Sequence, residues 1–197
     1  MTRFLLAALL LGLSLLLPGV AMAADLAPGM LLVARDQIQD PRFRETVVLV
    51  MQHEHQGTVG LILNRPSRLP LAEAVPDQQE LNKTTVTLSY GGPVAPESLL
   101  VLVAAGETPP TPALQIFGSL YVTGIEPLAA WLAPGRPAAD YRVFLGYAGW
   151  GTGQLEREMQ TGAWQILPPD AQQPFTSQLD SLWSELRKRD TPQPLLP

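Results

Sequence analysis

Two histidines stand close together in the sequence, His53 and His55, with Glu54 between them. Residues two apart on a strand point to the same face, so both imidazoles could bind one metal ion. These are the only histidines of the chain, however, and a zinc site would need carboxylates from elsewhere. The cluster also lies where a predicted strand ends beside a turn, a place where polar residues gather. We therefore expect a hydrogen-bonded turn and no metal site.

Signals for a catalytic nucleophile are weak. The chain has no cysteine, and it has no Gly-x-Ser-x-Gly motif, since Gly118-Ser119 lacks the second glycine. Catalytic residues therefore stay unassigned and no cofactor is expected. A hydrolase with His53 or Glu156 as its general base remains an alternative.

The best candidate for a polar ligand contact is Asn64-Arg65, which directly follows an apolar stretch. A guanidinium can hold a carboxylate or a phosphate through two parallel hydrogen bonds. The structural alternative, which we favour, is that Asn64 starts a turn and Arg65 pairs with a local acid.

Two segments are rich in glycine. The segment 146–153 lacks the lysine of a phosphate-binding loop, and Glu156 and Glu158 in the helix that follows would repel phosphate. We expect a tight turn there that lets Trp150 pack close to the backbone. Gly91-Gly92-Pro93 predicts a second turn, with a residue at positive φ.

Six strands and two helices are predicted from the pattern of apolar residues. The strands are Met30–Ala34, Thr46–Met51, Thr58–Leu63, Val86–Tyr90, Leu99–Val103 and Tyr141–Tyr147. Gly57 is expected to join the second and third strands as a hairpin. One helix spans about 154–160 and ends at Gly162, and an amphipathic helix with a cationic last turn spans about 175–189.

Two shorter motifs also bear on the helices. Asp40-Pro41 predicts a helix cap followed by proline at the first helical position. Arg187-Lys188-Arg189 is interpreted as a helix C-terminus that complements the helix dipole, rather than as a nucleic-acid patch. Since strands dominate and helices come late, the sequence predicts an α+β fold. It would be a single compact domain with a mainly antiparallel β-sheet, a few flanking helices and a C-terminal amphipathic helix.

Composition bounds the class of protein. The chain has 197 residues, 46% of them hydrophobic, which suits one globular domain. Its net charge is -5, an unfavourable balance for binding nucleic acid.

The N-terminus predicts export. Arg3 precedes an apolar stretch from Phe4 to Leu17, and a small-x-small site ends at Ala23, as in a secretory signal peptide. Pro18 ends the apolar run short of the roughly 20 residues that a membrane helix needs. An uncleaved N-terminal anchor is the alternative. We expect a signal peptide at residues 1–23 cleaved after Ala23, a domain at 24–190, a disordered tail at 191–197, and a periplasmic or secreted protein without a membrane span in its mature part.

Several segments resemble the YqgE/AlgH family, in family order over roughly residues 30–189. The matching blocks are Leu32-Val33-Ala34, residues 39–48, His53, residues 57–66, Gly91-Gly92-Pro93-Val94, residues 145–151, residues 153–158 and Ala163-Trp164. Each block alone is weak, but together they are specific. The resemblance implies a single-domain α+β fold and carries the label of a transcriptional regulator. It implies no established catalytic residues.

The matched positions supply the candidate ligand-binding residues, which are His53, Asn64, Arg65, Gly91, Gly92, Gly149, Trp150, Gln154 and Glu156. This chain departs from the family in two ways. Family members often carry Cys-Glu-His where it has Met51-Gln52-His53, so thiol chemistry is absent. They also usually begin near the first strand, whereas this chain begins with the predicted signal peptide, which would keep it from a promoter.

The sequence thus predicts a non-enzymatic regulatory or binding module for a small ligand or a protein partner. The turns at Asn64-Arg65, Gly91-Gly92 and Gly149-Trp150 are expected to line one cleft. A hydrolase acting on an envelope component and a transcriptional regulator are the alternatives, and no nucleic-acid partner is expected if the protein is exported.

Overall fold

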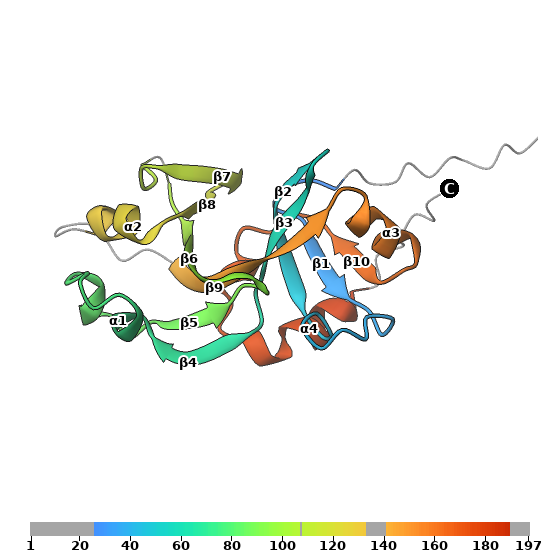
Figure 1. Cartoon of the computed structure of the whole chain (residues 1–197), viewed down its shortest axis with the longest axis horizontal. Coiled ribbons are helices and arrows are strands. Elements are labelled where there is room, and N and C mark those ends of the chain that lie inside the picture. The colour runs from blue at the N-terminus through green and yellow to red at the C-terminus, as the bar shows by residue number, and fades with distance from the viewer. Residues whose placement is uncertain (1–25, 107, 133–140, 190–197) are drawn as a thin grey trace, which may run out of the picture.

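The computed structural model describes residues 26–106, 108–132 and 141–189, which form one curled ten-stranded sheet with helices packed around it (Figure 1). The predicted signal peptide and the predicted C-terminal tail lie outside the described residues. Neighbouring strands pair antiparallel, apart from β5 and β9, which pair in parallel. The predicted α+β class with a mainly antiparallel sheet is therefore confirmed.

The main path of the sheet has the order β10-β1-β2-β3-β9-β6-β8-β7, while β4 pairs with β5 and β5 with β9. The strands are β1 (Leu31–Ala34), β2 (Val47–Glu54), β3 (Gly57–Ile62), β4 (Pro66–Pro70), β5 (Thr87–Tyr90), β6 (Val94–Ala104), β7 (Ala113–Phe117), β8 (Leu120–Thr123), β9 (Tyr141–Gly151) and β10 (Trp164–Leu167). The α-helices are α1 (Leu71–Ala74), α2 (Ile125–Trp131), α3 (Gln154–Gln160) and α4 (Leu179–Arg187), and 3-10 turns occupy η1 (Leu81–Lys83) and η2 (Gln173–Phe175).

The predicted β2–β3 hairpin forms, but its turn falls at His55-Gln56, and Gly57 is the first residue of β3, paired with Glu54. Successive side chains of a strand point to opposite faces, so a strand buried on both faces is apolar throughout. In β2, Leu49 and Met51 join one core cluster, whereas Val48 and Val50 join another on the opposite face. The continuous apolar run of β2 therefore reflects a strand with packed layers on both sides.

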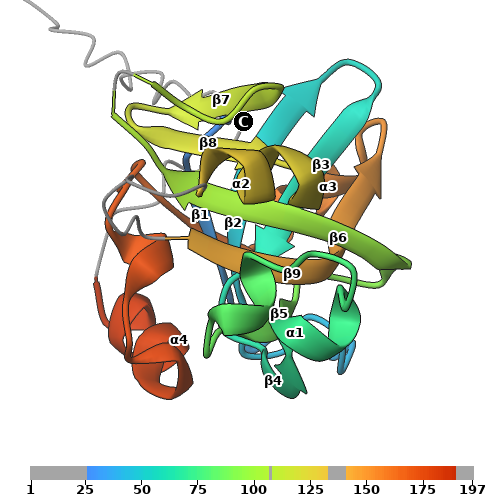
Figure 2. The same cartoon turned by 90° about the vertical axis from the view of Figure 1, so that its left-hand side faces the viewer.

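The sheet curls until its two ends approach each other. Ile116 of β7 and Leu120 of β8 belong to the same core cluster as Leu31 of β1 and Leu167 of β10. Figure 2 shows β6 and β9 side by side across the middle of the molecule, and Figure 1 places α1 and α2 at one end, α3 at the other, and α4 below the middle. Within the described residues, no helix has the length and apolar character needed to cross a membrane.

The prediction of a turn at residues 146–153 is wrong over most of that segment. Strand β9 continues through the glycines to Gly151, and the chain turns only at Thr152-Gly153, where Gly153 has φ 68°. Gly146 has φ +64°, and a Cβ there would stand 2.7 Å from the carbonyl oxygens of Gly92 and Val94. Glycine thus lets the neighbouring strand approach β9 without interrupting it.

Two predictions about helices also need correction. Residues 41–45 form turns instead of a helix: Asp40 accepts the Arg42 amide as a helix cap would, but Glu45 takes φ 57° before β2 begins, so the helical turn does not continue. The C-terminal helix begins at Leu179 instead of Phe175, because Thr176 is extended after η2 and interrupts the helical run. By contrast, Gly162 takes the expected left-handed conformation, with φ 74°, just after α3.

Candidate functional site

The structure divides the expected single cleft into two hollows. We call the first the Arg65 hollow; its volume is about 250 Å³, and it is lined by Pro41, Arg42, Ile62, Arg65, Tyr90, Gly92 and Pro93. We call the second the sheet hollow; its volume is about 340 Å³, and it is lined by Gln52, Glu54, Gln56, Gly57, Thr58, Val59, Val94, Tyr147, Gly149 and Trp150. Two of the three predicted turns therefore meet in the Arg65 hollow, while Gly149 and Trp150 line the other.

The Arg65 hollow is held together by the backbone of two strands. The amide of Tyr90 donates to the carbonyl oxygen of Arg65 at 2.8 Å, and the amide of Ile62 donates to that of Gly91 at 2.9 Å. These bonds place the turn after β5 beside the end of β3. Tyr90, at the edge of the hollow, is 55% exposed.

Gly91 and Gly92 let the same turn approach β9 closely. A Cβ on Gly91 would lie 2.3 Å from the carbonyl oxygen of Gly146, and one on Gly92 would lie 2.2 Å from the carbonyl group of Tyr147. Gly92 also has φ +153°, where side chains are strained. Both glycines therefore let the turn pack against β9, and Gly92 is also one of the residues that line the hollow.

Asn64 and Arg65 have different surroundings. Asn64 is 8% exposed, its Oδ1 accepts the Val47 amide at 2.8 Å, and its Nδ2 donates to the Glu45 carbonyl oxygen at 2.8 Å. Its side chain therefore fastens the start of β2. Arg65 is half-buried and donates from Nη2 to the carbonyl oxygen of Arg44 at 2.6 Å, so its partner is a neutral backbone group rather than the acid expected from the sequence.

The second arginine of the hollow is already paired. Arg42 binds the Asp40 carboxylate through Nε and Nη2, with an Nη2–Oδ2 distance of 2.5 Å. Hydrogen bonds from Arg42 hold the pKa of Asp40 below its usual value. None of the ion pairs formed by the described residues involves Arg65. Of the two arginines that line the hollow, Arg65 is therefore the one that forms no ion pair with the described part of the chain.

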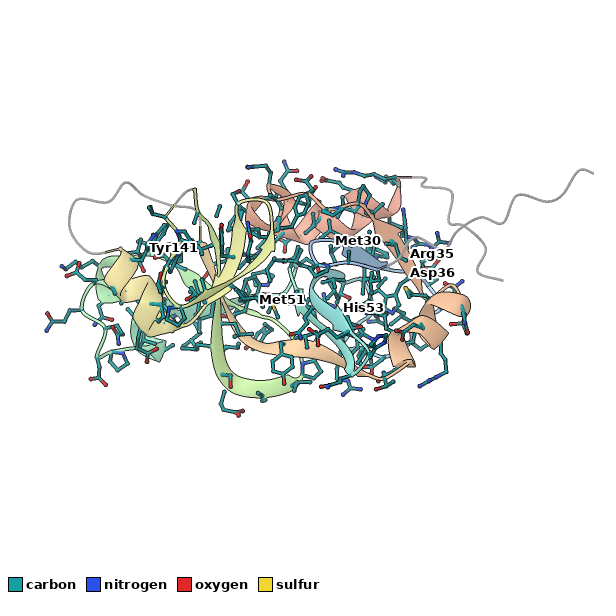
Figure 3. The ribbon with its side chains drawn as sticks, turned by 90° about the horizontal axis from the view of Figure 1, so that it is seen from above. Met30, Arg35, Asp36, Met51, His53 and Tyr141 are labelled. Carbon is teal, nitrogen blue, oxygen red and sulfur yellow. The ribbon has the colours of Figure 1, made fainter. Side chains whose placement is uncertain are left out.

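His53 lies on the other side of the sheet from the sheet hollow, since Gln52 and Glu54, its neighbours on β2, line that hollow. Its Nδ1 lies 2.8 Å from Thr58 Oγ1, and its Nε2 lies 3.9 Å from Glu156 Oε1. The position of His53 in the molecule is seen in Figure 3. The Thr58 hydroxyl belongs to a residue only 2% exposed. This arrangement links β2, β3 and α3 rather than presenting a nucleophile to solvent.

The described residues contain no group of three or more His, Asp or Glu side chains arranged to hold a metal ion.

Two further candidates, Trp150 and Gln154, belong to a polar network on α3 with Glu158 at its centre, and Glu158 is not among the residues predicted from the sequence. Glu158 Oε2 accepts the indole N–H of Trp150 at 3.0 Å and that of Trp164 at 2.8 Å, and Oε1 accepts Gln154 Nε2 at 3.0 Å. Gln154 Oε1 in turn accepts the Gly151 amide at 3.2 Å. We call this set the α3 network. It fastens the helix to the sheet and to a cluster of three aromatic rings, Phe43, Trp150 and Trp164.

Arg142 of β9 is a second residue missed from the sequence. Its guanidinium donates to the carbonyl oxygens of Leu63 and Pro174 and to Ser89 Oγ, each at 2.8 Å, and lies 4.8 Å from the centre of the Phe144 ring. Burial lowers the pKa of Arg142 to about 10, which still leaves it protonated at neutral pH. A single arginine within an alternating strand gives no sequence signal of such burial.

Comparison with known proteins places this fold in a recognised class. The family model described as AlgH-like matches residues 31–194. A UPF0301 protein of Streptomyces coelicolor is 36% identical over 169 residues, which cover 82% of this chain and 85% of that protein. A UPF0301 protein of Chlorobaculum tepidum is 35% identical over 160 residues, which cover 81% of this chain and 84% of that protein.

Solved structures agree with the sequence relatives. The solution structure of the AlgH protein from Pseudomonas aeruginosa matches with a TM-score of 0.66 at 31% identity, over 82% of this chain and 87% of that chain. A crystal structure of a Corynebacterium diphtheriae protein matches with a TM-score of 0.69 at 26% identity, over 87% and 91% of the two chains. The fold is that of a curled antiparallel α+β domain shared with these proteins. The chain belongs to the AlgH-like family, as the resemblance found in its sequence implies.

Proposed function

We propose that this protein is a non-enzymatic binding module that takes a small organic carboxylate with an apolar or aromatic body in the Arg65 hollow. The observation that carries the proposal is the guanidinium of Arg65. It is half-buried beside the exposed ring of Tyr90, and no carboxylate of the described residues pairs with it.

The chemistry of the lining supports this class of ligand. Pro41, Ile62 and Pro93 give the hollow apolar walls, and the Tyr90 ring offers a flat surface. A charged donor among apolar groups favours an anion, because a hydrogen bond with an ionised partner is about twice as strong as a neutral one. The ligand that fits both features carries one carboxylate next to an apolar body.

Arg65 keeps donors for such a ligand. The guanidinium has five N–H groups in a planar fork, and its contact with the Arg44 carbonyl oxygen occupies only one nitrogen. That contact also fixes the direction of the side chain. A carboxylate can therefore meet an arginine that is already oriented.

The regulator and hydrolase alternatives are less well supported. The net charge of -5 opposes binding to DNA. In the hydrolase alternative the base is His53 or Glu156, but His53 is engaged with a Thr58 hydroxyl that is buried. Hydrolysis of an envelope substrate that is lost on His53→Ala and on Glu156→Ala would favour the hydrolase.

We further propose that the protein works outside the cytoplasm, after cleavage between Ala23 and Ala24. The support is the basic residue, apolar stretch and small-x-small site at its N-terminus. The intact mass of protein expressed from the full-length sequence and purified from periplasm tests this directly. A mass that includes residues 1–23 would contradict cleavage.

The binding proposal is tested by titrating ¹⁵N-labelled protein, expressed from the full-length sequence, with benzoate and with its neutral analogue benzamide. We expect saturable shifts for the amides of Arg65, Tyr90 and Gly92 with benzoate, and much smaller ones with benzamide. Arg65→Gln should weaken benzoate binding by roughly tenfold or more, since it removes a charge-assisted pair.

The matched control is Arg68→Gln on β4, which removes the same charge from an exposed side chain outside the hollow. It should leave benzoate binding within about twofold of wild type. Equal weakening by the two variants, or equal binding of benzoate and benzamide, would contradict the proposal.

A further inference from the structure

A polar pocket of about 280 Å³ lies where the end of β1 meets the end of α4. We call it the arginine pocket, and it is lined by Arg35, Asp36, Gln37, Gln165, Arg187 and Arg189. Figure 3 shows Arg35 and Asp36 next to each other, at the opposite end of the molecule from Tyr141. The pocket shares no lining residue with the Arg65 hollow.

The charges of the pocket are unbalanced. Arg187 forms an ion pair with Asp36, so one guanidinium is neutralised. Arg35 takes part in none of the ion pairs or side-chain hydrogen bonds formed by the described residues, and Arg189 donates only to Gln173 Oε1, at 3.4 Å. Two of the three guanidiniums that line this small volume therefore form no ion pair with the described part of the chain, in a protein whose net charge is -5.

The elements that carry these arginines are firmly joined. Trp183 of α4 donates from its indole nitrogen to the Ala34 carbonyl oxygen at 2.7 Å, and Arg187 lies over its ring, 5.2 Å from the centre. Gln165 Nε2 donates to the carbonyl oxygen of Arg189. The Arg35 amide donates to the Ala163 carbonyl oxygen at 2.9 Å. The backbone positions of all three arginines are thus fixed before any ligand arrives.

The helix dipole explains only part of this cluster. Cations at the last turn of a helix are stabilised by its carbonyl groups, which accounts for Arg187 and Arg189. Arg35, however, follows a β-strand and lies 152 positions before Arg187 in the sequence. Its presence in the same pocket is an arrangement that helix stability does not require.

We infer that the arginine pocket binds a phosphate-type dianion, either a free phosphate or phosphate ester or a phospholipid headgroup. The two uncompensated guanidiniums match the two negative charges of such a group. Gln165 and Gln37 add amide groups to the lining. This inference goes beyond the proposed carboxylate site, because it concerns other residues and another ligand.

The test is a titration of the protein, expressed from the full-length sequence, with inorganic phosphate at constant ionic strength and about pH 8, where phosphate is mainly the dianion. The readouts are the amide signals of Asp36, Gln37 and Gln165 and the Nε–Hε signals of the arginines. We expect saturable shifts. Arg35→Gln and Arg189→Gln should each weaken phosphate binding by about tenfold or more.

The matched control is Lys188→Gln, which removes one positive charge from the exposed neighbour of two pocket arginines without touching the lining. It should change binding by no more than about twofold. Arg65→Gln should leave phosphate binding at this pocket unchanged, which separates this inference from the proposed function. The absence of saturable shifts, or weakening by Lys188→Gln equal to that by Arg35→Gln, would overturn it.

The source of the phosphate is distinguished by flotation with vesicles of phosphatidylcholine, with and without phosphatidate. Flotation that needs both phosphatidate and Arg35 would identify a lipid headgroup. No flotation, with specific binding of inorganic phosphate retained, would identify a small soluble phosphate compound. Both results are interpreted only together with the phosphate titration, in which weaker binding by Arg35→Gln is what supports phosphate binding in the arginine pocket.

Discussion

Two arginines of this protein both donate to backbone carbonyl oxygens, yet their surroundings differ. Arg142 has three acceptors at 2.8 Å and the face of Phe144, all inside the fold. Arg65 has one backbone acceptor and stands at the wall of a hollow beside an exposed tyrosine. The comparison suggests that the partners of a charged group, rather than its residue type, separate a structural role from a binding role.

The other candidate residues also differ in whether their polar groups are already engaged within the fold. In the α3 network, Trp150 and Gln154 are engaged by Glu158, and His53 is engaged by Thr58. These side chains hold a helix on the sheet and have few donors left for a ligand. The arginine pocket resembles the Arg65 hollow instead, because Arg35 lacks a counter-charge in the described part of the chain.

The largest expected effect on stability separates the two arginines themselves. Arg142→Met should lower the free energy of unfolding by about 3 kcal/mol, because the oxygens of Leu63, Ser89 and Pro174 lose a charged donor inside the fold. Arg65→Met should lower it by no more than about 0.5 kcal/mol. Urea unfolding at neutral pH measures both. Equal losses of unfolding free energy in the two variants would contradict the difference in role between Arg142 and Arg65.

A smaller loss of stability is expected within the α3 network. Glu158→Ala removes the common acceptor of two indole N–H groups, so we expect a loss of about 2 kcal/mol. The control is Glu156→Ala on the same helix, whose carboxylate lies 3.9 Å from His53 and is partly exposed; it should cost no more than about 0.5 kcal/mol. Thermal unfolding of the pair measures this, and a larger loss for Glu156→Ala would show that His53 and Glu156 matter more than the indole contacts.

The smallest effect concerns the charge balance of the Arg65 hollow. Arg42 holds the pKa of Asp40 below its usual value, so the contribution of this pair to stability is present above the unfolded pKa of 3.8 and is lost as the pH falls through the folded pKa. Titration of the Asp40 carboxyl by NMR should give a value below 3.8 in the wild type and an ordinary value in Arg42→Gln. A pKa unchanged by Arg42→Gln would mean that Arg42 is not neutralised by Asp40, and that Arg65 is not the only uncompensated charge in the hollow.

The sequence predicts best where burial is complete. Strands β2 and β3 carry long apolar runs because both of their faces are packed, and their hairpin is predicted correctly although its turn falls at His55-Gln56, just before Gly57. Strands β7 and β10 are short, and β7 exposes Leu114 and Phe117, so their patterns do not stand out from a loop. Helix α1 has only four residues, too few to show a helical period.

The candidate site was predictable only in part. Arg65 and Gly92 were recognised as residues that could meet a ligand, and the fold brings them into one hollow. Their meeting depends on the bond between the Tyr90 amide and the Arg65 carbonyl oxygen, which no local pattern encodes. The same holds for Arg35 and Arg187, which become neighbours only because α4 packs against β1.

The most direct test of the central claim is a measurement of intermolecular nuclear Overhauser effects between benzoate and the protein. Our account predicts contacts from the benzoate ring to Tyr90 and Pro93, and their loss in Arg65→Gln. Contacts to Tyr147 and Val94 in the sheet hollow, unchanged by Arg65→Gln, would contradict it.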